Sequence, residues 1–306
     1  MKKKFEDFIE HSGKVLVGYE RISESLFTAL LCNGHVLLEG PPGVAKTTLA
    51  KTFSNLVSAG FKRIQFTPDL LPTDIVGTMM FDPKKGEFKM RKGPIFTNIV
   101  LADEINRASP KTQSALLEAM EEKQVTIEGT TYQLEAPFIV IATQNPVEQE
   151  GTYPLPEAQL DRFLFKMNVE YPNKKDETEI VKKVVAKSNE KIKSLFEKTD
   201  ILSLRKETEK IYVSEEIIEY ITSIVTDLRK NSVVAWGPSP RASIALMMVG
   251  RTAAFLEGRN FISPADVNKF AVEILSHRIG IKPESEVEGV TTSGVVSDIL
   301  SQVDAI

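Results

Sequence analysis

Short apolar runs alternate with helical patterns over roughly the first half of the chain. Each run has the length of a strand, and most are rich in isoleucine, valine, leucine and phenylalanine. This is the pattern of a parallel sheet whose two faces are covered by helices. The runs are His35–Glu39, Arg63–Phe66, Ile99–Ala102, Phe138–Thr143 and Phe163–Val169. They predict a doubly wound α/β fold for this part of the chain.

Segments whose apolar residues recur at helical spacing lie between these predicted strands. Apolar positions within Leu49–Val57 form one stripe, and Ser109-Pro110 supplies a cap and a first-turn proline for a second helix. Two further segments, Met79–Arg91 and Val125–Leu134, have strand-like arms around turn signals and read as β-hairpins. Neither hairpin is needed to build the sheet.

The pattern becomes helical after a boundary near residues 171–176. Ser214 is placed to cap a helix, Ser239-Pro240 opens a second that ends near Gly258, and a third is predicted from Ser263-Pro264 to about Arg278. The apolar stripe of the first of these helices is Ile217, Ile218, Ile221, Ile224, Val225 and Leu228. We therefore predict two domains: residues 1–172, an α/β core with hairpin inserts near 79–91 and 125–134, and residues 173–306, a small all-helical domain.

The composition is that of an ordinary soluble globular protein, with 42% hydrophobic and 26% charged residues among 306. A net charge of −4 disfavours a nucleic-acid partner, although a local basic channel would escape a whole-chain count. Cys32 is the only cysteine, which excludes an intrachain disulfide and disfavours a zinc site. We read the scattered His11, His35 and His277 as structural or surface residues. No membrane span or secretory signal is recognisable, so we expect a cytoplasmic protein.

A phosphate-binding loop is predicted between the first strand and the helix that follows it. The general pattern is G-x-x-x-x-G-K-[ST], and here Ala45 replaces the second glycine. Alanine keeps the backbone donor, so we expect it to be tolerated unless its φ must be positive. Backbone N–H groups would hold phosphate oxygens, Lys46 would reach the β- and γ-phosphates, and Thr47 would bind Mg²⁺. The predicted loop is Gly40, Pro41, Pro42, Gly43, Val44, Ala45, Lys46, Thr47 and Thr48.

Two carboxylates, Asp103 and Glu104, end the third apolar run. Since successive strand residues point in opposite directions, one can face a metal ion and the other an attacking water. Asp103 suits the Mg²⁺ site and Glu104 suits a general base. The alternative for the pair alone is an acidic strand end in solvent, which becomes improbable beside a phosphate loop.

Residue type alone does not settle the roles of three further polar residues. Asn145 follows the fourth run, where an amide can orient water or sense a γ-phosphate, but Asn-Pro also begins ordinary turns. Arg162 suits a surface salt bridge as well as it suits catalysis. Arg241 lies in the first turn of a predicted helix, where a cation opposes the helix dipole, which hints at a phosphate partner.

Together these motifs resemble the MoxR-type AAA+ ATPases. The resemblance rests on Gly40–Thr48, Asp103-Glu104, "ATQNP" at 142–146, "EGTYPLPEAQLDRF" at 150–163 and "SPRA" at 239–242, and it covers essentially the whole chain. It implies a P-loop NTPase with a five-stranded parallel αβα sandwich core and an all-helical lid domain.

The resemblance also implies roles for residues that the chemistry left open. Asn145 matches sensor 1, Arg162 the arginine finger that reaches a neighbouring subunit, and Arg241 sensor 2, while Val17-Gly18 resembles the segment near adenine. Cofactors would be ATP and Mg²⁺. The hairpins would face a client protein in a hexameric ring, alongside a von Willebrand factor A-domain protein.

Two departures from the general pattern accompany this resemblance. Ala45 fits the subfamily, whose loops often carry alanine. Tyr19 stands where many relatives have glutamine, which puts the fine detail of the adenine pocket in doubt.

Three other functions compete with ATP hydrolysis. Asp74–Gly77 and Asn173–Asp176 spell GTPase motifs but lie in the wrong context. A nucleotide-dependent scaffold with little hydrolysis is disfavoured by Glu104. A DNA-directed AAA+ motor or loader is disfavoured by the slightly acidic charge.

Overall fold

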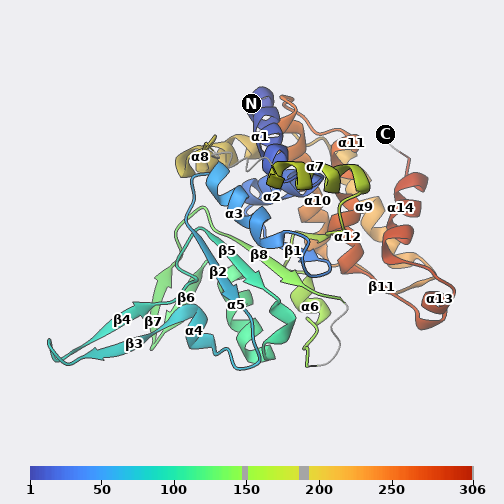
Figure 1. Cartoon of the computed structure of the whole chain (residues 1–306). Coiled ribbons are helices and arrows are strands. Elements are labelled where there is room, and N and C mark those ends of the chain that lie inside the picture. The colour runs from blue at the N-terminus through green and yellow to red at the C-terminus, as the bar shows by residue number, and fades with distance from the viewer. Residues whose placement is uncertain (147–150, 186–192, 305–306) are drawn as a thin grey trace. The chain divides into compact units, whose positions relative to one another are not determined.

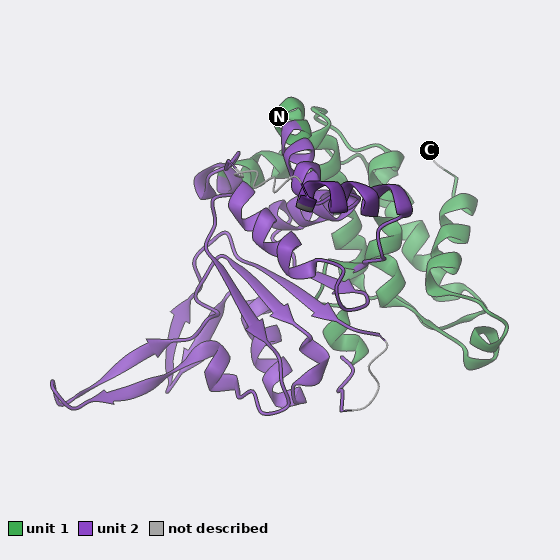
Figure 2. Cartoon of the chain, in the orientation of Figure 1, with its two compact units in different colours: residues 1–6, 156–166, 203–306 green, residues 7–155, 167–202 purple. Residues whose placement is uncertain are grey.

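The computed structural model describes residues 1–146, 151–185 and 193–304. The chain forms two compact units, coloured separately in Figure 2. Unit 1 comprises residues 1–6, 156–166 and 203–306, and unit 2 comprises residues 7–155 and 167–202. These units divide the chain differently from the boundary expected after residue 172, which stays a prediction about the domains.

A five-stranded parallel sheet is the centre of the α/β part of the chain (Figure 1). Its strand order is β2-β5-β8-β1-β9, and the doubly wound prediction is confirmed. The central strands β5 and β8 are apolar and almost wholly buried, whereas β2 lies at an edge and carries exposed polar residues. The strands are β1 (Val36–Glu39), β2 (Phe61–Gln65), β5 (Ile99–Asp103), β8 (Ile139–Gln144) and β9 (Phe165–Asn168).

Helices of unit 2 cover this sheet. Helix α3 connects β1 to β2 and α5 connects β5 to β8, so the chain moves in opposite directions along the sheet. Right-handed crossovers then place these two helices on opposite faces, as Figure 1 shows. The rings of Phe8, Phe27, Phe53 and Phe196 meet in one aromatic cluster beside α3. The helices that lie wholly or partly in unit 2 are α1 (Lys2–Val15), α2 (Glu20–Leu31), α3 (Lys46–Leu56), α4 (Pro72–Val76), η1 (Ile105–Arg107), α5 (Pro110–Glu122), α7 (Lys174–Val185) and α8 (Lys198–Glu209).

Two antiparallel hairpins lie at the positions expected from the sequence. The first pairs β3 (Gly77–Asp82) with β4 (Glu87–Lys92), and the second pairs β6 (Gln124–Ile127) with β7 (Thr130–Gln133). Both are two-stranded and neither pairs with the central sheet. The first extends well away from the sheet, at the lower left of Figure 1.

Unit 1 is mostly helical. Ser214 and Ser239 cap α9 and α10 as predicted, each accepting a first-turn N–H bond on its hydroxyl oxygen. The elements are α6 (Glu157–Leu160), α9 (Glu215–Lys230), β10 (Val234–Trp236), α10 (Pro240–Leu256), α11 (Pro264–Asn268), α12 (Ala271–Leu275), η2 (Ser276–Arg278), β11 (Gly280–Ile281), α13 (Pro283–Val287) and α14 (Thr292–Gln302).

Two helix predictions in unit 1 need correction. The single helix predicted from Ser263 to Arg278 is broken into α11, α12 and η2, because Phe270 leaves helical geometry and buries its ring against Phe165. Ile218 was assigned to the buried stripe of α9 but is 43% exposed, since it lies at the edge of the stripe. Packing overrides the helical period in the first case, whereas in the second the period itself places Ile218 at the border of the buried face.

Candidate nucleotide-binding and hydrolysis site

The predicted phosphate loop connects β1 to α3, so that Lys46, Thr47 and Thr48 form the first helical turn. A helix N-terminus directs backbone N–H groups toward an anion. Gly40 must be glycine, because a Cβ there would lie 2.3 Å from the carbonyl oxygen of Val169. The Lys46 ammonium donates to the loop carbonyls of Gly40 at 2.6 Å and Pro41 at 3.3 Å. The Lys46 ammonium therefore lies over the phosphate loop that precedes it.

Ala45 has the positive φ that would make alanine unfavourable at this position. Its φ is +54° and its ψ is +22°, in the left-handed region. A residue with a Cβ pays about 1–2 kcal/mol for that conformation. The loop thus stores backbone strain beside the predicted phosphate site, as functional segments often do.

We expect Ala45→Gly to raise the free energy of unfolding of the nucleotide-free protein by about 1 kcal/mol, because glycine adopts the left-handed region without a steric penalty. Chemical denaturation measures the change. Ala115→Gly, within α5, is the matched control and should lower stability by about 1 kcal/mol. A loss of stability at both positions would contradict the strain at Ala45.

The acidic pair is arranged differently from the strand alternation that predicted it. Asp103 is the last residue of β5, but Glu104 lies beyond the strand with a left-handed φ of +57°. Thr143 of β8 joins the two: its hydroxyl donates to Asp103 Oδ1 at 2.6 Å and accepts the Glu104 N–H at 2.9 Å. A buried hydroxyl therefore connects the Asp103 carboxylate to the Glu104 backbone.

Each carboxylate also contacts side chains of its own. The Arg63 guanidinium donates to Asp103 Oδ2 from Nε at 2.9 Å and from Nη2 at 2.7 Å. Glu104 Oε2 accepts from Gln65 Nε2 at 2.8 Å and from Arg107 Nη1 at 2.9 Å. The two acids have different direct donors, and Arg63 Nη2 also donates to Gln65 Oε1 at 2.5 Å, so one hydrogen-bond network connects them.

Sequence reasoning missed Arg63, Gln65 and Thr143. Arg63 and Gln65 are two residues apart on β2, where Gln65 lies opposite Asp103 in the parallel register. Side chains two apart share a sheet face, so both can reach the acidic strand end. The sequence signals that could have indicated these residues are the polar side chains within the strand sequences "FKRIQ" and "IVIATQ".

Asn145 directly follows β8 and is buried. Because β1, β5 and β8 are parallel neighbours, their carboxyl ends meet at one edge of the sheet. Ligands of open α/β sheets bind at such an edge. The structure therefore brings Asn145, the phosphate loop and the acidic pair together.

Val17 and Gly18 lie in the turn between α1 and α2. Gly18 has a φ of +83°, and a Cβ there would lie 2.7 Å from a carboxylate oxygen of Asp176 in α7. Tyr19, which departs from the family pattern, is buried, and its hydroxyl donates to the carbonyl of Glu170 at 3.3 Å. The departure is thus accommodated by a hydrogen bond within unit 2.

Arg162 and Arg241 both belong to unit 1. Arg162 lies between α6 and β9, and Arg241 lies in the first turn of α10. The carboxylate of Asp161 is 3.9 Å from Arg241 Nη1. Of the "EGTYPLPEAQLDRF" motif that contains Arg162, the residue Glu150 lies outside the described residues.

The two GTPase-like segments have local structural roles. Asp74 accepts the Leu71 N–H at 2.9 Å at the start of α4. Asn173 Oδ1 accepts the N–H groups of Lys175 and Asp176, both at 3.0 Å, and so caps α7. Neither segment adjoins the phosphate loop in the chain.

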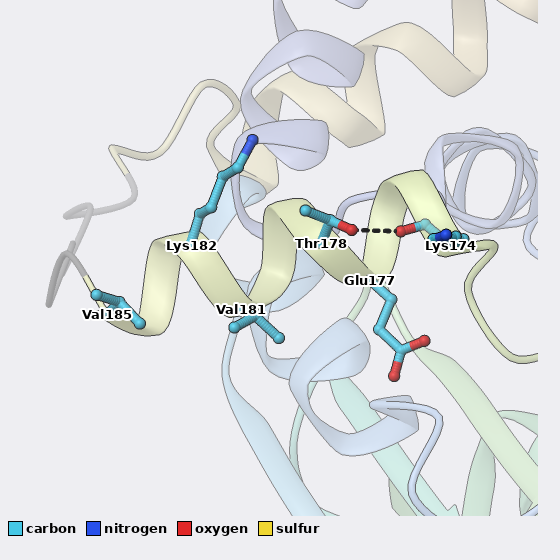
Figure 3. A pocket seen from close by; sticks show the side chains of 6 residues that line it. All are labelled: Lys174, Glu177, Thr178, Val181, Lys182 and Val185. Carbon is cyan, nitrogen blue, oxygen red and sulfur yellow. Dashed lines mark hydrogen bonds between the residues drawn. The ribbon is translucent and has the colours of Figure 1, made fainter.

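A hollow of about 520 Å³ is lined by one face of α7, and none of the predicted nucleotide-binding residues takes part in it (Figure 3). No group of three or more histidine, cysteine, aspartate or glutamate side chains in residues 1–146, 151–185 and 193–304 suits a metal ion. Every helix in those ranges is too short or too polar to serve as a membrane span.

Comparison with known proteins identifies the family. The model of the "ATPase family associated with various cellular activities (AAA)" matches residues 35–165, and that of the AAA lid domain matches residues 226–299. The chain is 48% identical to YeaC of Bacillus subtilis, over 96% of this chain and 92% of that protein. It is 42% identical to the chaperone MoxR1 of Mycobacterium tuberculosis, over 95% of this chain and 79% of that protein.

A crystal structure of a candidate ATPase from Cytophaga hutchinsonii superposes with a TM-score of 0.92 and 43% identity, covering 100% of this chain and 96% of that one. Likeness of this extent and identity covers both the α/β core and the helical part. The chain belongs to the MoxR family of AAA+ ATPases, enzymes that hydrolyse ATP.

Proposed function

We propose that this ATPase hydrolyses Mg²⁺-bound ATP at the interfaces between its own subunits and thereby remodels or matures partner proteins. The observation that carries the proposal is the meeting of the phosphate loop, Asp103, Glu104 and Asn145 at the carboxyl ends of three neighbouring strands. The chaperone-like part of the proposal is supported by the relative MoxR1, which is named a chaperone.

The residues divide the chemistry among them. Loop N–H groups and Lys46 hold the phosphates, and Val17-Gly18 borders the adenine. Glu104 takes the proton of the attacking water, while Asn145 orients that water or the γ-phosphate. Arg162 contacts the γ-phosphate bound in the neighbouring subunit, and Arg241 contacts the nucleotide of its own subunit.

Magnesium fits the donors at this site. The Thr47 hydroxyl and the Asp103 carboxylate are hard oxygen ligands of the kind that Mg²⁺ prefers. When bound, the ion would neutralise charge on the β- and γ-phosphates. Thr143 would hold Asp103 in place through its 2.6 Å bond to the carboxylate.

Phosphate release with ATP and with GTP, each with and without Mg²⁺, tests the proposed reaction. We expect turnover with ATP that requires Mg²⁺ and is lost in Lys46→Ala. A clear preference for GTP, or equal turnover after removal of Mg²⁺, would refute it.

We predict that Arg63→Gln lowers the Mg²⁺ concentration needed for half-maximal turnover by roughly 3- to 10-fold, because a guanidinium on Asp103 competes with the metal ion. Lys62→Gln is the matched control, since its side chain leaves the opposite face of β2. The competition is excluded if the Mg²⁺ requirement of Arg63→Gln equals that of the control.

The proposed assembly is a homo-oligomer, because a finger acting in trans requires a neighbouring subunit, and the resemblance to MoxR-type AAA+ ATPases supports a hexameric ring. A von Willebrand factor A-domain protein and a client protein are the proposed partners. Sedimentation with and without ATP tests the ring, and a monomer that turns over ATP at the full rate would contradict it.

The β3–β4 hairpin is the proposed contact for the client. Phe81 and Phe88 face each other across its strands, 55% and 68% exposed, with ring centroids 5.4 Å apart. Exposed aromatic pairs are typical of binding surfaces. The hairpin also carries five basic side chains against two acidic ones: Lys84, Lys85, Lys89, Arg91 and Lys92 against Asp82 and Glu87. We therefore propose that it binds apolar segments flanked by acidic residues.

We expect the double variant Phe81→Ser/Phe88→Ser to keep its basal ATPase rate and to lose most of the stimulation caused by an unfolded, acidic polypeptide such as reduced, carboxymethylated α-lactalbumin. The reason is that both rings lie on the hairpin, outside the nucleotide site. Tyr212→Ser, another exposed aromatic residue, is the control. Equal stimulation of all three proteins would disprove the contact.

Binding of DNA is the second candidate, favoured by the same basic and aromatic hairpin. Titration of single-stranded DNA at several salt concentrations distinguishes the two. A steep salt dependence that disappears in the hairpin variant would favour the DNA-directed function over the chaperone-like one.

A further inference from the structure

One guanidinium in unit 1 forms several hydrogen bonds to the segment that carries Arg162. Arg278, at the end of η2, donates from Nε to Asp161 Oδ1 at 2.8 Å. Its Nη2 donates to the carbonyl oxygens of Asp161 at 3.2 Å and Phe163 at 2.7 Å. Its Nη1 donates to the carbonyl oxygens of Leu164 and Ile274. The residues before and after Arg162 are thus held by the same side chain.

This contact leaves no donor of Arg278 unused. An arginine side chain has five N–H donors in a fixed fork, and the five bonds engage all of them. The side chain is only 3% exposed, and burial lowers the pKa of Arg278 while Asp161 opposes that change. A desolvated guanidinium with complete hydrogen bonding resists displacement, so the backbone beside Arg162 has little freedom.

His277, the neighbour of Arg278, holds the same segment. Its Nε2 lies 3.0 Å from the carbonyl oxygen of Phe163. Burial, and then the charge of Arg278, lowers the pKa of His277 well below its usual value, so the ring is neutral and Nε2 carries the donated proton. The Phe163 carbonyl consequently receives bonds from both residues.

The second oxygen of Asp161 reaches the helix that carries Arg241. Asp161 Oδ2 accepts from the Ser239 hydroxyl at 2.9 Å, and the Ser239 oxygen in turn accepts the Arg241 N–H at 3.2 Å. Ser239 is the N-cap of α10, so the carboxylate is bonded to the first turn of that helix. Asp161 therefore joins the immediate neighbours of Arg162 and of Arg241.

We propose that Asp161 and Arg278 are positioning residues that hold Arg162 and Arg241 in one rigid arrangement. The inference rests on the proposed roles of these two arginines. Arg241 contacts the nucleotide of its own subunit, and Arg162 that of the neighbour. A displacement of Arg241 when its nucleotide changes is then passed through Asp161 to Arg162, so that one site controls hydrolysis at the next.

The two bonds of Asp161 have separable consequences. Asp161→Asn weakens the charged bond to Arg278 and so loosens the backbone on both sides of Arg162. Ser239→Gly removes the hydroxyl that bonds both to Asp161 Oδ2 and to the Arg241 N–H, and it leaves the bonds between Arg278 and Asp161 in place. Because glycine is nearly as good an N-cap as serine, α10 itself should still form. The first change should affect the rate at the neighbouring site, and the second should affect nucleotide affinity at the subunit's own site.

Mixed oligomers test the first consequence. An Arg162→Ala subunit keeps an intact ATP site but cannot supply an arginine finger to its neighbour. A Glu104→Gln subunit supplies the finger but does not hydrolyse its own ATP. Their mixture should regain activity. We expect donors carrying Glu104→Gln together with Asp161→Asn to give a rescued kcat about 10- to 100-fold lower, as a misplaced catalytic group does.

The outcomes separate this inference from the proposed function. If Glu104→Gln donors fail to rescue, the trans role of Arg162 is wrong. If they rescue and the doubly substituted donors rescue equally well, the positioning role of Asp161 is wrong. Thermal unfolding of each subunit and its ATP affinity show that a donor is folded.

Ser239→Gly tests the second consequence, the effect on nucleotide affinity at the subunit's own site. This test remains available if Asp161→Asn does not fold. We expect a several-fold higher KM for ATP and a lower Hill coefficient for ATP turnover, with an unchanged rescued kcat when the variant is the donor. An unchanged KM and Hill coefficient would overturn the proposed connection between Arg162 and Arg241.

Discussion

Arg162→Ala is expected to keep ATP binding and to lose about 10³-fold or more of its turnover. A finger stabilises charge that develops on the transferred phosphoryl group, so its removal affects the transition state far more than nucleotide affinity. Fluorescent nucleotide titration and steady-state phosphate release measure the two quantities on the same preparation. The position suits this role because Arg278 bonds to the backbone on both sides of it.

Arg162→Lys is the informative companion variant. Lysine keeps the charge but lacks the planar fork of guanidinium donors, so we expect only a small part of the lost turnover to return. Arg259→Ala, which removes another arginine of unit 1 that is paired with Asp266, should leave kcat nearly unchanged. A loss of ATP binding in Arg162→Ala would show instead that the residue acts within its own site.

The central strands of the sheet could be predicted from the sequence because they are buried on both faces. The runs that became β5 and β8 are continuous and apolar, and such runs are recognised without knowledge of their neighbours. The edge strand β2 was predicted to begin at Arg63, whereas it begins at Phe61, since exposed polar residues there weaken the apolar pattern.

The broken helix after Ser263 marks the limit of periodic patterns. Its sequence continues a helical spacing through residue 278, yet Phe270 interrupts the helix and packs against Phe165, more than 100 residues away in the chain. A contact so distant in sequence is invisible to any local window.

In the candidate site, too, local motifs could be predicted from the sequence and contacts between distant segments could not. The phosphate loop and the acidic pair form continuous motifs, so their residues were identified together. The partners Arg63 and Thr143 reach Asp103 from two different strands, and their proximity depends on the strand order β2-β5-β8. The left-handed conformations of Ala45 and Glu104 were also not predicted, because neither residue favours them. Such strain is found by observation at functional sites rather than deduced from residue type.

Glu104→Gln is expected to bind ATP at least as well as the native protein and to lower turnover by about 10²- to 10⁴-fold, the usual contribution of a general base. Glutamine has the same shape and can still accept a hydrogen bond from Gln65 or Arg107, while the Glu104 N–H that bonds to Thr143 is unaffected. What it cannot do is take a proton from water. A single-turnover measurement of phosphate release isolates this chemical step.

The matched control is Glu128→Gln. Glu128 is likewise a glutamate with a positive φ, +46°, but it lies in the exposed turn between β6 and β7. Both substitutions therefore place glutamine in left-handed backbone, and only one alters the candidate site. If turnover falls in Glu104→Gln alone, the loss belongs to the missing base rather than to backbone strain. If turnover survives in both, Glu104 is not the base, and water must be activated by another group at the same strand ends.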